Sequence, residues 1–443
     1  MQEVDKIIMA RWVIPLQSQN EYLEHTAVVI NNGKIIDIVP NDQINTKYLS
    51  NNVLSLDQHA LLPGFINSHT HSPMNLFRGI ADDLPLMQWL TNHIWPAEQN
   101  TITPDTVTLG SQLAIAEMIR GGTTCFNDHY FFPESTEQVA IQTGIRACLG
   151  LQVFNVKTLW SNNEAEAIAK AKDILHRRFN THPNITWSIA PQGPYSVDNN
   201  ALEQIKLISE QYEIPVHIHM HETQAEIHKS LQDYGCRPLE RFHNLGLIND
   251  KLLAVHMVHI NAEEIRTITD KNVNIVHSPE SNLKLGSGIA PIYQLQQAGA
   301  NIALGTDGAA SNNDLDMIGE MRTASLLAKG ITNNAAALNS YDILKMATIN
   351  GARALGIDTI TGSLESGKQA DIIAIDLSDV WQQPILNPVS HIVYSGNRLS
   401  VSDCWVNGKQ LLKNKQLTTI NASELLTKLK KVTTRIEPFR RKT

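Results

Sequence analysis

Short apolar runs alternate with longer amphipathic segments through the middle of the chain. Eight of these runs have the length and composition of buried strands: residues 62–67, 123–127, 146–153, 185–190, 215–220, 252–256, 273–277 and 301–306. The segments between them carry helix signals, such as Thr103-Pro104 before one apolar face and Gly121 after it. This alternation predicts an α/β fold, a (β/α)8 TIM-type barrel. A doubly wound open sheet is the alternative, although no Gly-x-Gly-x-x-Gly sequence follows the first strand.

Both ends of the chain are rich in short strands and turns. Residues 1–60 contain a hairpin signal at Asn32-Gly33, and residues 362–420 contain a similar one at Asn407-Gly408. Neither piece is large enough to hold a good core alone, so we predict that both termini form one small β-sandwich domain. The barrel then spans residues 61–361, and a C-terminal helix with a basic tail occupies residues 421–443.

Polar residues follow the ends of the predicted strands. Active sites of TIM-type barrels lie at this carboxyl end of the strands. His69 and His71 are two residues apart at the end of the first strand, so both side chains point to one face and can bind one ion. Asp307 follows the eighth strand, and this position favours a ligand, although an Asp-Gly pair also suits an Asx turn.

The fifth strand carries three histidines, His217, His219 and His221, of which at most two can reach the same ion. We favour His219, because Glu222 lies three residues on, where the strand gives way to a loop. A ligand and an acid can then both face the cavity. The other two histidines are interpreted as residues of the core or the rim.

Two further strands end near histidines. His256 and His259 follow the sixth strand, and His256 is closer to the strand end, whereas a loop hydrogen bond explains His277 equally well. Three neutral imidazoles and one carboxylate suit Zn²⁺, with Fe²⁺ as the alternative. Barrels that hold two ions use a carboxylated lysine on a middle strand. The fourth strand, residues 185–190, has no lysine, which favours a single ion.

Composition narrows the class of protein further. The formal net charge of −8 gives no reason to expect a nucleic acid partner. The four cysteines are scattered without a Cys-x-x-Cys pair, which favours reduced thiols in a cytoplasmic protein. We expect no signal peptide and no membrane partner, because the acidic N-terminus lacks an apolar segment and no apolar run approaches the ~20 residues of a membrane helix.

Several segments together resemble the amidohydrolase superfamily, and within it the methylthioadenosine/S-adenosylhomocysteine deaminases. The resemblance spans nearly the whole chain. The matching segments are LPGFINSHTH (62–71), LPLMQWL (84–90), IWPAE (94–98), GGTTCF (121–126), HMHE (219–222), SNLKLGSGIAP (281–291) and GTDG (305–308). The resemblance implies a metal-dependent hydrolase that removes the amino group of an adenosine-type nucleoside, with methylthioadenosine, S-adenosylhomocysteine and adenosine as candidates.

The resemblance also implies a role for individual residues. It implies that the metal is bound by His69, His71, His219 and Asp307. Glu222 would carry a proton to a ring nitrogen of the substrate, and His256 would assist the attacking water together with Asp307. Glu98 would bind the ribose hydroxyls, and Arg146 would contact the distal group of the substrate.

One segment departs from the family pattern. Relatives show Pro-His-x-Pro-Tyr after the fourth strand, whereas this chain has Pro-Gln-Gly-Pro-Tyr, with Gln192 in place of the histidine. Gln192 can still hydrogen-bond the substrate, but it cannot carry charge. The rival interpretations are a related enzyme acting on guanine, a pterin or a triazine, and a catalytically inactive barrel used for binding. We expect a homo-oligomer, as is common in this superfamily.

Overall fold

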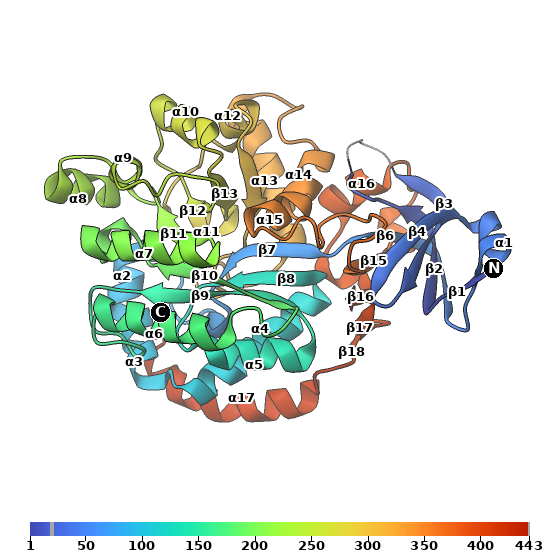
Figure 1. Cartoon of the computed structure of the whole chain (residues 1–443), viewed down its shortest axis with the longest axis horizontal. Helices are drawn as coiled ribbons and strands as arrows, with labels where there is room; N and C mark the ends of the chain where they lie inside the picture. Colours follow the sequence, from blue (N-terminus) through green and yellow to red (C-terminus); the bar gives the residue numbers. More distant parts are fainter. Residues whose placement is uncertain (18–21, 442–443) are drawn as a thin grey trace.

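Eight parallel strands form the sheet at the centre of the molecule, in the computed structural model that describes residues 1–17 and 22–441 (Figure 1). They lie side by side in the order of the sequence. The strands are β7 (Phe65–Thr70), β8 (Thr123–Asp128), β9 (Arg146–Val153), β10 (Ile185–Pro191), β11 (Val216–Met220), β12 (Leu252–His256), β13 (Asn274–His277) and β14 (Asn301–Leu304). The chain after β14 returns to β7, where the Asp307 amide donates to the His69 carbonyl at 3.0 Å. The predicted barrel is confirmed.

The first predicted strand, residues 62–67, belongs to two different strands. Strand β6 (Val53–Pro63) ends in the sheet of the termini, and β7 begins at Phe65 in the barrel. Gly64 makes the turn between them, where a Cβ atom would lie only 2.0 Å from the Thr124 side chain. An unbroken apolar run predicted one strand here because both sheets bury it, and the close approach at Gly64 divides it.

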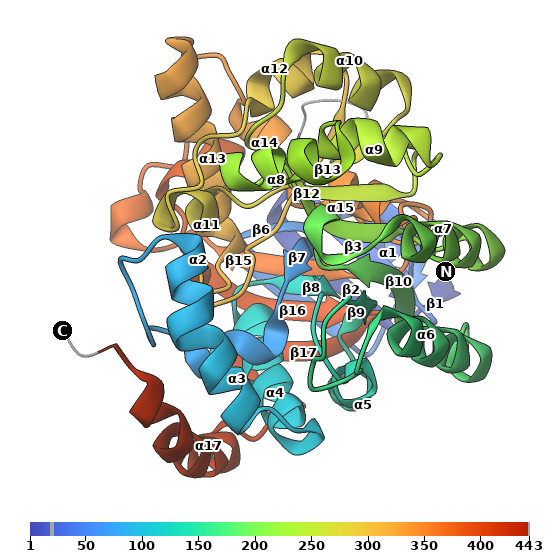
Figure 2. The same cartoon turned by 90° about the vertical axis from the view of Figure 1, so that its left-hand side faces the viewer.

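Helices cover the outside of the barrel (Figure 2). Thr103 caps α4, whose apolar face packs on the barrel as predicted, and Gly121 ends it. The covering helices are α4 (Pro104–Arg120), α5 (Pro133–Thr143), α6 (Glu164–Arg178), α7 (Asn199–Tyr212), α8 (Gln224–Tyr234), α9 (Pro238–Asn244), α10 (Ala262–Asp270), α11 (Pro279–Lys284), α12 (Ile292–Gln297), α13 (Met317–Thr332), α14 (Ser340–Met346) and α15 (Ile349–Ala354). Helix α15 packs with the apolar residues inside the barrel, such as Ile66 and Val255, and so closes the end of the barrel away from the histidines.

Strands from both ends of the chain form a second eight-stranded sheet, which lies to one side of the barrel (Figure 1). Its strands are β2 (Lys6–Val13), β3 (Leu23–Asn31), β4 (Lys34–Pro40), β6, β15 (Ile372–Asp376), β16 (Val401–Val406), β17 (Lys409–Lys413) and β18 (Gln416–Leu417). The N-terminal and C-terminal halves meet where β6 pairs antiparallel with β15. Trp405 from the C-terminal half is fully buried against Ile8 and Val28 from the N-terminal half. Both termini therefore share one core, as expected for two pieces too small to fold alone.

The C-terminal helix α17 (Ala422–Ile436) lies along α4 and α3 (Trp95–Thr101) (Figure 2). Asn421 caps it, and Leu425, Val432 and Ile436 form its buried face. Lys442, in the basic tail, lies outside the described residues. Among the helices of the described chain, none has both the length and the apolar composition needed to cross a membrane.

A buried ion pair joins the barrel to the sheet of the termini. Arg146, the first residue of β9, donates to both carboxylate oxygens of Asp371, at 3.0 Å from Nε and 3.3 Å from Nη2. The same guanidinium donates to Asn407 at 2.7 Å and to the Pro183 carbonyl at 3.1 Å. Asp371 also accepts the Asn407 amide, so every charged group here has several partners. Such a pair is costly to break, because the remaining charge stays buried.

We predict that Arg146→Met lowers the free energy of unfolding by about 3–5 kcal/mol, since Asp371 is left buried and unpaired. Chemical denaturation of the purified variant measures this loss. Arg177→Met is the control: Arg177 pairs with Asp173 on an exposed helix face, and its removal should leave stability unchanged. If Arg146→Met instead keeps normal stability and binds substrate more weakly, the structural role of the Arg146–Asp371 ion pair is contradicted. That result would support the substrate role that the resemblance implies.

Candidate metal centre

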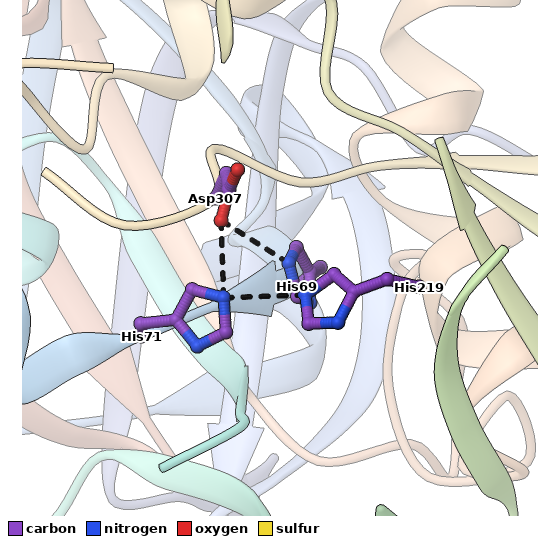
Figure 3. A group of neighbouring side chains, drawn as sticks. All are labelled: His69, His71, His219 and Asp307. Carbon is purple, nitrogen blue, oxygen red and sulfur yellow. Dashed lines mark hydrogen bonds and ion pairs between the residues drawn. The ribbon is translucent and has the colours of Figure 1, made fainter. Parts of the chain in front are cut away.

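Four side chains converge at the carboxyl end of the barrel strands (Figure 3). His69 and His71 come from β7, His219 from β11, and Asp307 from the turn after β14. Asp307 Oδ1 lies 3.3 Å from His69 Nε2 and 3.2 Å from His71 Nε2, and the Nε2 atoms of His71 and His219 lie 3.3 Å apart. One ligand atom from each of the four residues lies within 4.8 Å of the others. All four predicted metal ligands are therefore brought together.

The outer nitrogen of each imidazole has its own hydrogen-bond partner. His71 Nδ1 donates to the His129 carbonyl at 2.5 Å, and His219 Nδ1 donates to the Gln192 carbonyl at 2.6 Å. A carbonyl only accepts, so the proton of each neutral ring is on Nδ1. His69 Nδ1 lies 2.9 Å from His217 Nε2, which can accept in the same way. Three Nε2 lone pairs thus face one point, the arrangement found around protein-bound metals.

Burial and charge fit this assignment. Burial holds the pKa of His69 and that of His219 well below the usual value, so both rings are neutral. Burial also opposes protonation of His71, but its hydrogen bond to Asp307 outweighs this and raises its pKa. Although burial by itself raises the pKa of Asp307, the hydrogen bonds with His69 and His71 hold it well below 3.8, and the carboxylate is ionised. His69 Nε2 is buried and faces Asp307 Oδ1 at 3.3 Å, as two ligands of one cation would. The donor set therefore fits a divalent ion.

Asp307 has a left-handed backbone conformation, with φ of 59°, which is uncommon among residues other than glycine although Asp adopts it more often than most. Ser281 Oγ donates to Asp307 Oδ2 at 2.6 Å, and the Gly308 amide donates to Oδ1 at 2.8 Å. The Gly308 bond joins neighbouring residues, whereas an Asx turn is closed by the amide two residues on, so this bond is not the Asx turn that the Asp-Gly pair also suited. The backbone nevertheless turns sharply at Asp307. The turn aims the carboxylate at the histidines.

Two further histidines complete the cluster. His217, interpreted from the sequence as a core or rim residue, is fully buried and orients His69. His129 follows β8, and its ring centroid lies 4.8 Å from that of His219 and 5.4 Å from that of His71. His129 was not among the residues predicted from the sequence, although its place after a barrel strand is the same signal that identified the others. Burial lowers the pKa of His129 and that of His217, so neither adds charge.

Glu222 and His256 lie beside the four ligands. His256 ends β12, and its ring centroid is 5.5 Å from that of His219. His256 Nδ1 donates to Asn282 Oδ1 at 2.8 Å, which leaves Nε2 as a proton acceptor. Ser287 Oγ donates to Glu222 Oε1 at 3.3 Å. Burial raises the pKa of Glu222, and this effect outweighs the opposing field of His256.

Glu98 reaches the same region from outside the barrel. It lies on α3, after α2 (Leu86–Trp89) and a single π-helical turn (Leu90–Ile94). Only 8% of Glu98 is exposed, and Tyr130 donates to its Oε1 at 2.5 Å. Burial raises the pKa of Glu98 to about 7, against the lowering by Tyr130 and by the nearby His71. A buried carboxylate is costly unless hydrogen-bond donors compensate it, and Tyr130 supplies one such donor here.

Two predicted substrate residues are placed differently. Gln192 follows β10 at the mouth, and its backbone carbonyl holds His219. Arg146 begins β9, at the opposite end of the strands, and is fully committed to Asp371 and Asn407. The substrate role expected for Arg146 is therefore corrected to a structural one. The motif around it matched the family, but a strand start cannot reach a site at the strand ends.

A metal centre with an adjacent acid, at the mouth of a (β/α)8 barrel, defines a class of metal-dependent hydrolases. The chain belongs to the amidohydrolase family, whose model matches residues 60–411. It is a hydrolase of that family. It is 43% identical to "5-methylthioadenosine/S-adenosylhomocysteine deaminase" of Saccharophagus degradans over 96% of this chain and 95% of the relative. The protein of the same name from Teredinibacter turnerae is 41% identical over 95% of each chain.

The fold is also similar to that of solved structures. An adenosine deaminase from Xanthomonas campestris with bound zinc superposes with a TM-score of 0.97 at 42% identity, covering 99% of both chains. A guanine deaminase from C. acetobutylicum has a TM-score of 0.81 at 23% identity, over 91% of this chain and 99% of the other. At that identity the likeness concerns the fold alone.

We predict that His217→Leu weakens zinc binding about 10- to 100-fold, because His69 loses the acceptor that fixes its tautomer and orientation. Competition with a chromophoric chelator measures the affinity. His277→Leu is a matched control: His277 is a buried histidine at the end of β13, and among the described residues it makes no hydrogen bond or ring contact with the four ligands. Equal zinc affinity in the two variants would show that His217 does not orient a ligand.

Proposed function

We propose that this protein is a hydrolytic deaminase of adenosine-type nucleosides, with 5′-methylthioadenosine and S-adenosylhomocysteine as the first substrates to test and adenosine as the third. The observation that carries the proposal is the position of Glu222. A carboxyl group with a raised pKa lies beside four candidate metal ligands and in the electrostatic field of both His256 and Asp307. The names of the full-length relatives and of the Xanthomonas structure support the same reaction.

One zinc ion per subunit is the proposed cofactor, held by His69, His71, His219 and Asp307. Three neutral imidazoles and a carboxylate suit Zn²⁺, and Fe²⁺ is the alternative. The zinc in the Xanthomonas structure supports the first choice. A bound ion of this kind supplies hydroxide at neutral pH by lowering the pKa of its water toward ~7.

Three residues at the proposed metal site carry out the proton transfers. Asp307 accepts one proton of the attacking water, with His256 Nε2 as a hydrogen-bond acceptor for the same water, while Glu222 in its acid form donates to the ring nitrogen next to the reacting carbon. Protonation makes that carbon more electrophilic, and the remaining hydroxyl group adds to it. The amino group then takes up the proton held by Asp307 and leaves as ammonia when its C–N bond breaks. The hydroxyl proton of the adduct returns to Glu222, and the base becomes the corresponding oxo base.

Glu98 is the proposed residue for the ribose hydroxyls, and Gln192 a proposed hydrogen-bond partner of the substrate. A free base such as guanine, a pterin or a triazine offers Glu98 no ribose, so a buried carboxylate with a raised pKa favours a nucleoside over those rings. An inactive binding barrel is disfavoured because all four candidate ligands and Glu222 are retained. The homo-oligomer and the cytoplasmic location stay predictions.

We predict that Glu222→Gln lowers kcat by about 10²- to 10⁴-fold, because the amide cannot donate a proton to the ring nitrogen. Zinc content should be unchanged, since Glu222 is not among the four proposed ligands. Steady-state ammonia release and metal analysis measure the two quantities. Glu263→Gln, on the exposed first turn of α10, is the control and should keep normal turnover. Normal turnover in Glu222→Gln would rule out the assigned proton transfer.

The substrate class is tested by a panel of purified compounds. Zinc-loaded protein should release ammonia from methylthioadenosine or S-adenosylhomocysteine, with the ultraviolet shift that accompanies formation of the inosine product. Guanine should not react. Glu98→Gln should raise KM for the nucleoside by about 10- to 200-fold, the effect of one or two lost hydrogen bonds worth about 1–3 kcal/mol, and should change kcat less.

The same panel of compounds can also contradict the proposed substrate class. Ammonia release from guanine or a triazine, with silence on every nucleoside, would overturn the proposed substrate class while leaving the family unchanged. A KM for the nucleoside that does not depend on Glu98 would remove that residue from the binding site.

A further inference from the structure

We infer that His259 is a positioning residue for the reaction, acting on Glu222 through Ser287. The inference rests on the proposed role of Glu222 as proton donor. It concerns a set of hydrogen bonds that joins three strand-end loops, those after β11, β12 and β13. Glu222, His259 and Ser287 are the members of the set that lie in these three loops, in that order.

The backbone of Glu222 is fixed by its own helix. Glu226, in the first turn of α8, accepts the Glu222 amide at 3.0 Å and the His221 amide at 2.7 Å. Burial raises the pKa of Glu226 to about 8, so this carboxyl group also avoids a buried charge at neutral pH. These bonds fix where the chain leaves the strand, but they leave the Glu222 side chain free to rotate.

Ser287 supplies the contact to that side chain. Its hydroxyl donates to Glu222 Oε1 at 3.3 Å, and only 7% of the residue is exposed. The loop that carries Ser287 follows α11 and turns at Gly288, where φ is +121°. A Cβ at Gly288 would lie 2.9 Å from Val258 and 3.6 Å from the His259 ring, so this loop packs directly on the loop after β12. The hydroxyl can therefore point at Glu222 only while the two loops keep this spacing.

His259 is the side chain that ties the two loops together. His259 Nε2 donates to the Ser287 carbonyl at 2.8 Å. This bond requires the proton of the His259 ring to be on Nε2. The other ring nitrogen, Nδ1, is accordingly an acceptor: it lies 3.0 Å from the Gln224 side-chain amide, which donates to it. One ring thus joins the start of α8 to the residue that contacts Glu222.

The backbone of His259 is itself fixed from two directions. Its carbonyl accepts from His221 Nδ1 at 3.1 Å and from Arg237 Nη2 at 2.6 Å, and its amide donates to the His221 carbonyl at 2.9 Å. Arg237 is held in turn by a two-point ion pair with Glu264, at 2.7 and 2.9 Å. The ring of His259 therefore projects from a rigid support, which a group that positions another group requires.

The experiment compares His259→Leu with His259→Gln and Ser287→Ala in the zinc-loaded full-length protein, using methylthioadenosine as the substrate. We expect His259→Leu and Ser287→Ala each to lower kcat about tenfold with KM and zinc content unchanged. His259→Gln should recover most of kcat, because its side-chain amide can donate to the Ser287 carbonyl. His228→Leu, an exposed histidine on α8, should behave like the unaltered protein.

A double-mutant cycle separates positioning of Glu222 from general structural damage. In a Glu222→Gln background, where residual turnover lacks the proton donor, adding His259→Leu or Ser287→Ala should lower kcat no further. The His259→Leu/Ser287→Ala pair should also fall no further than the worse single variant. A tenfold effect that persists without Glu222, or that is accompanied by loss of zinc, would overturn the inference.

The outcomes also separate this inference from the proposed function. If Glu222→Gln keeps normal turnover, the proton-transfer assignment fails and His259 has nothing to position. If Glu222→Gln abolishes turnover but His259→Leu keeps normal kcat, the proposed function stands and the role of His259 is excluded.

Discussion

Three buried imidazoles can share one point only if each presents an unprotonated nitrogen to it. The barrel meets this requirement by placing an acceptor behind every ring: the His217 ring for His69, the His129 carbonyl for His71, and the Gln192 carbonyl for His219. The last two acceptors follow β8 and β10, which neighbour the strands of His71 and His219, whereas His217 stands on β11, across the barrel from His69 on β7. The tautomers of the ligands therefore depend both on the register of neighbouring strands and on closure of the barrel. The chemistry of the site is in this sense a property of the whole barrel.

Several residues at the carboxyl ends of the barrel strands, beside the candidate metal ligands, have strained backbone conformations. His221, His256 and Asp307 all have positive φ, at 55°, 74° and 59°, although none is glycine. Each such residue costs about 1–3 kcal/mol and persists only where its surroundings fix it. Here the Asp307 amide donates to the His69 carbonyl, and the His259 amide donates to the His221 carbonyl, so the ladder continues past the strands and holds the turns. At Asp307 the sharp turn directs the carboxylate toward the His69 and His71 rings.

Much of this arrangement could be predicted from the sequence, because it follows from the periodicity of apolar residues and from the position of polar residues at the ends of the strands. Apolar runs ending in histidine or aspartate located the barrel strands and the four residues that meet, and the Asn-Gly pairs located two hairpins. Two features were beyond that reasoning. Gly64 divides an unbroken apolar run, because its backbone approaches Thr124 too closely for any side chain. The contacts of Arg146 with Asp371 and Asn407 join residues more than 200 positions apart, a pairing that depends on how the two sheets dock.

The proposed metal ligands and the residue proposed for the ribose are held by different means. His69, His219 and Asp307 are set by the strand register, whereas Glu98 comes from a helix that only packs against the barrel. That helix shares an apolar cluster with Tyr130 and with Val432 and Ile436 of α17. An apolar cluster tolerates substitution at constant volume far better than a network of tautomers does. The Glu98 side of the mouth can therefore tolerate substitution better than the histidines at the strand ends, while the barrel itself recurs in solved structures whose sequences are only 23% identical to this chain.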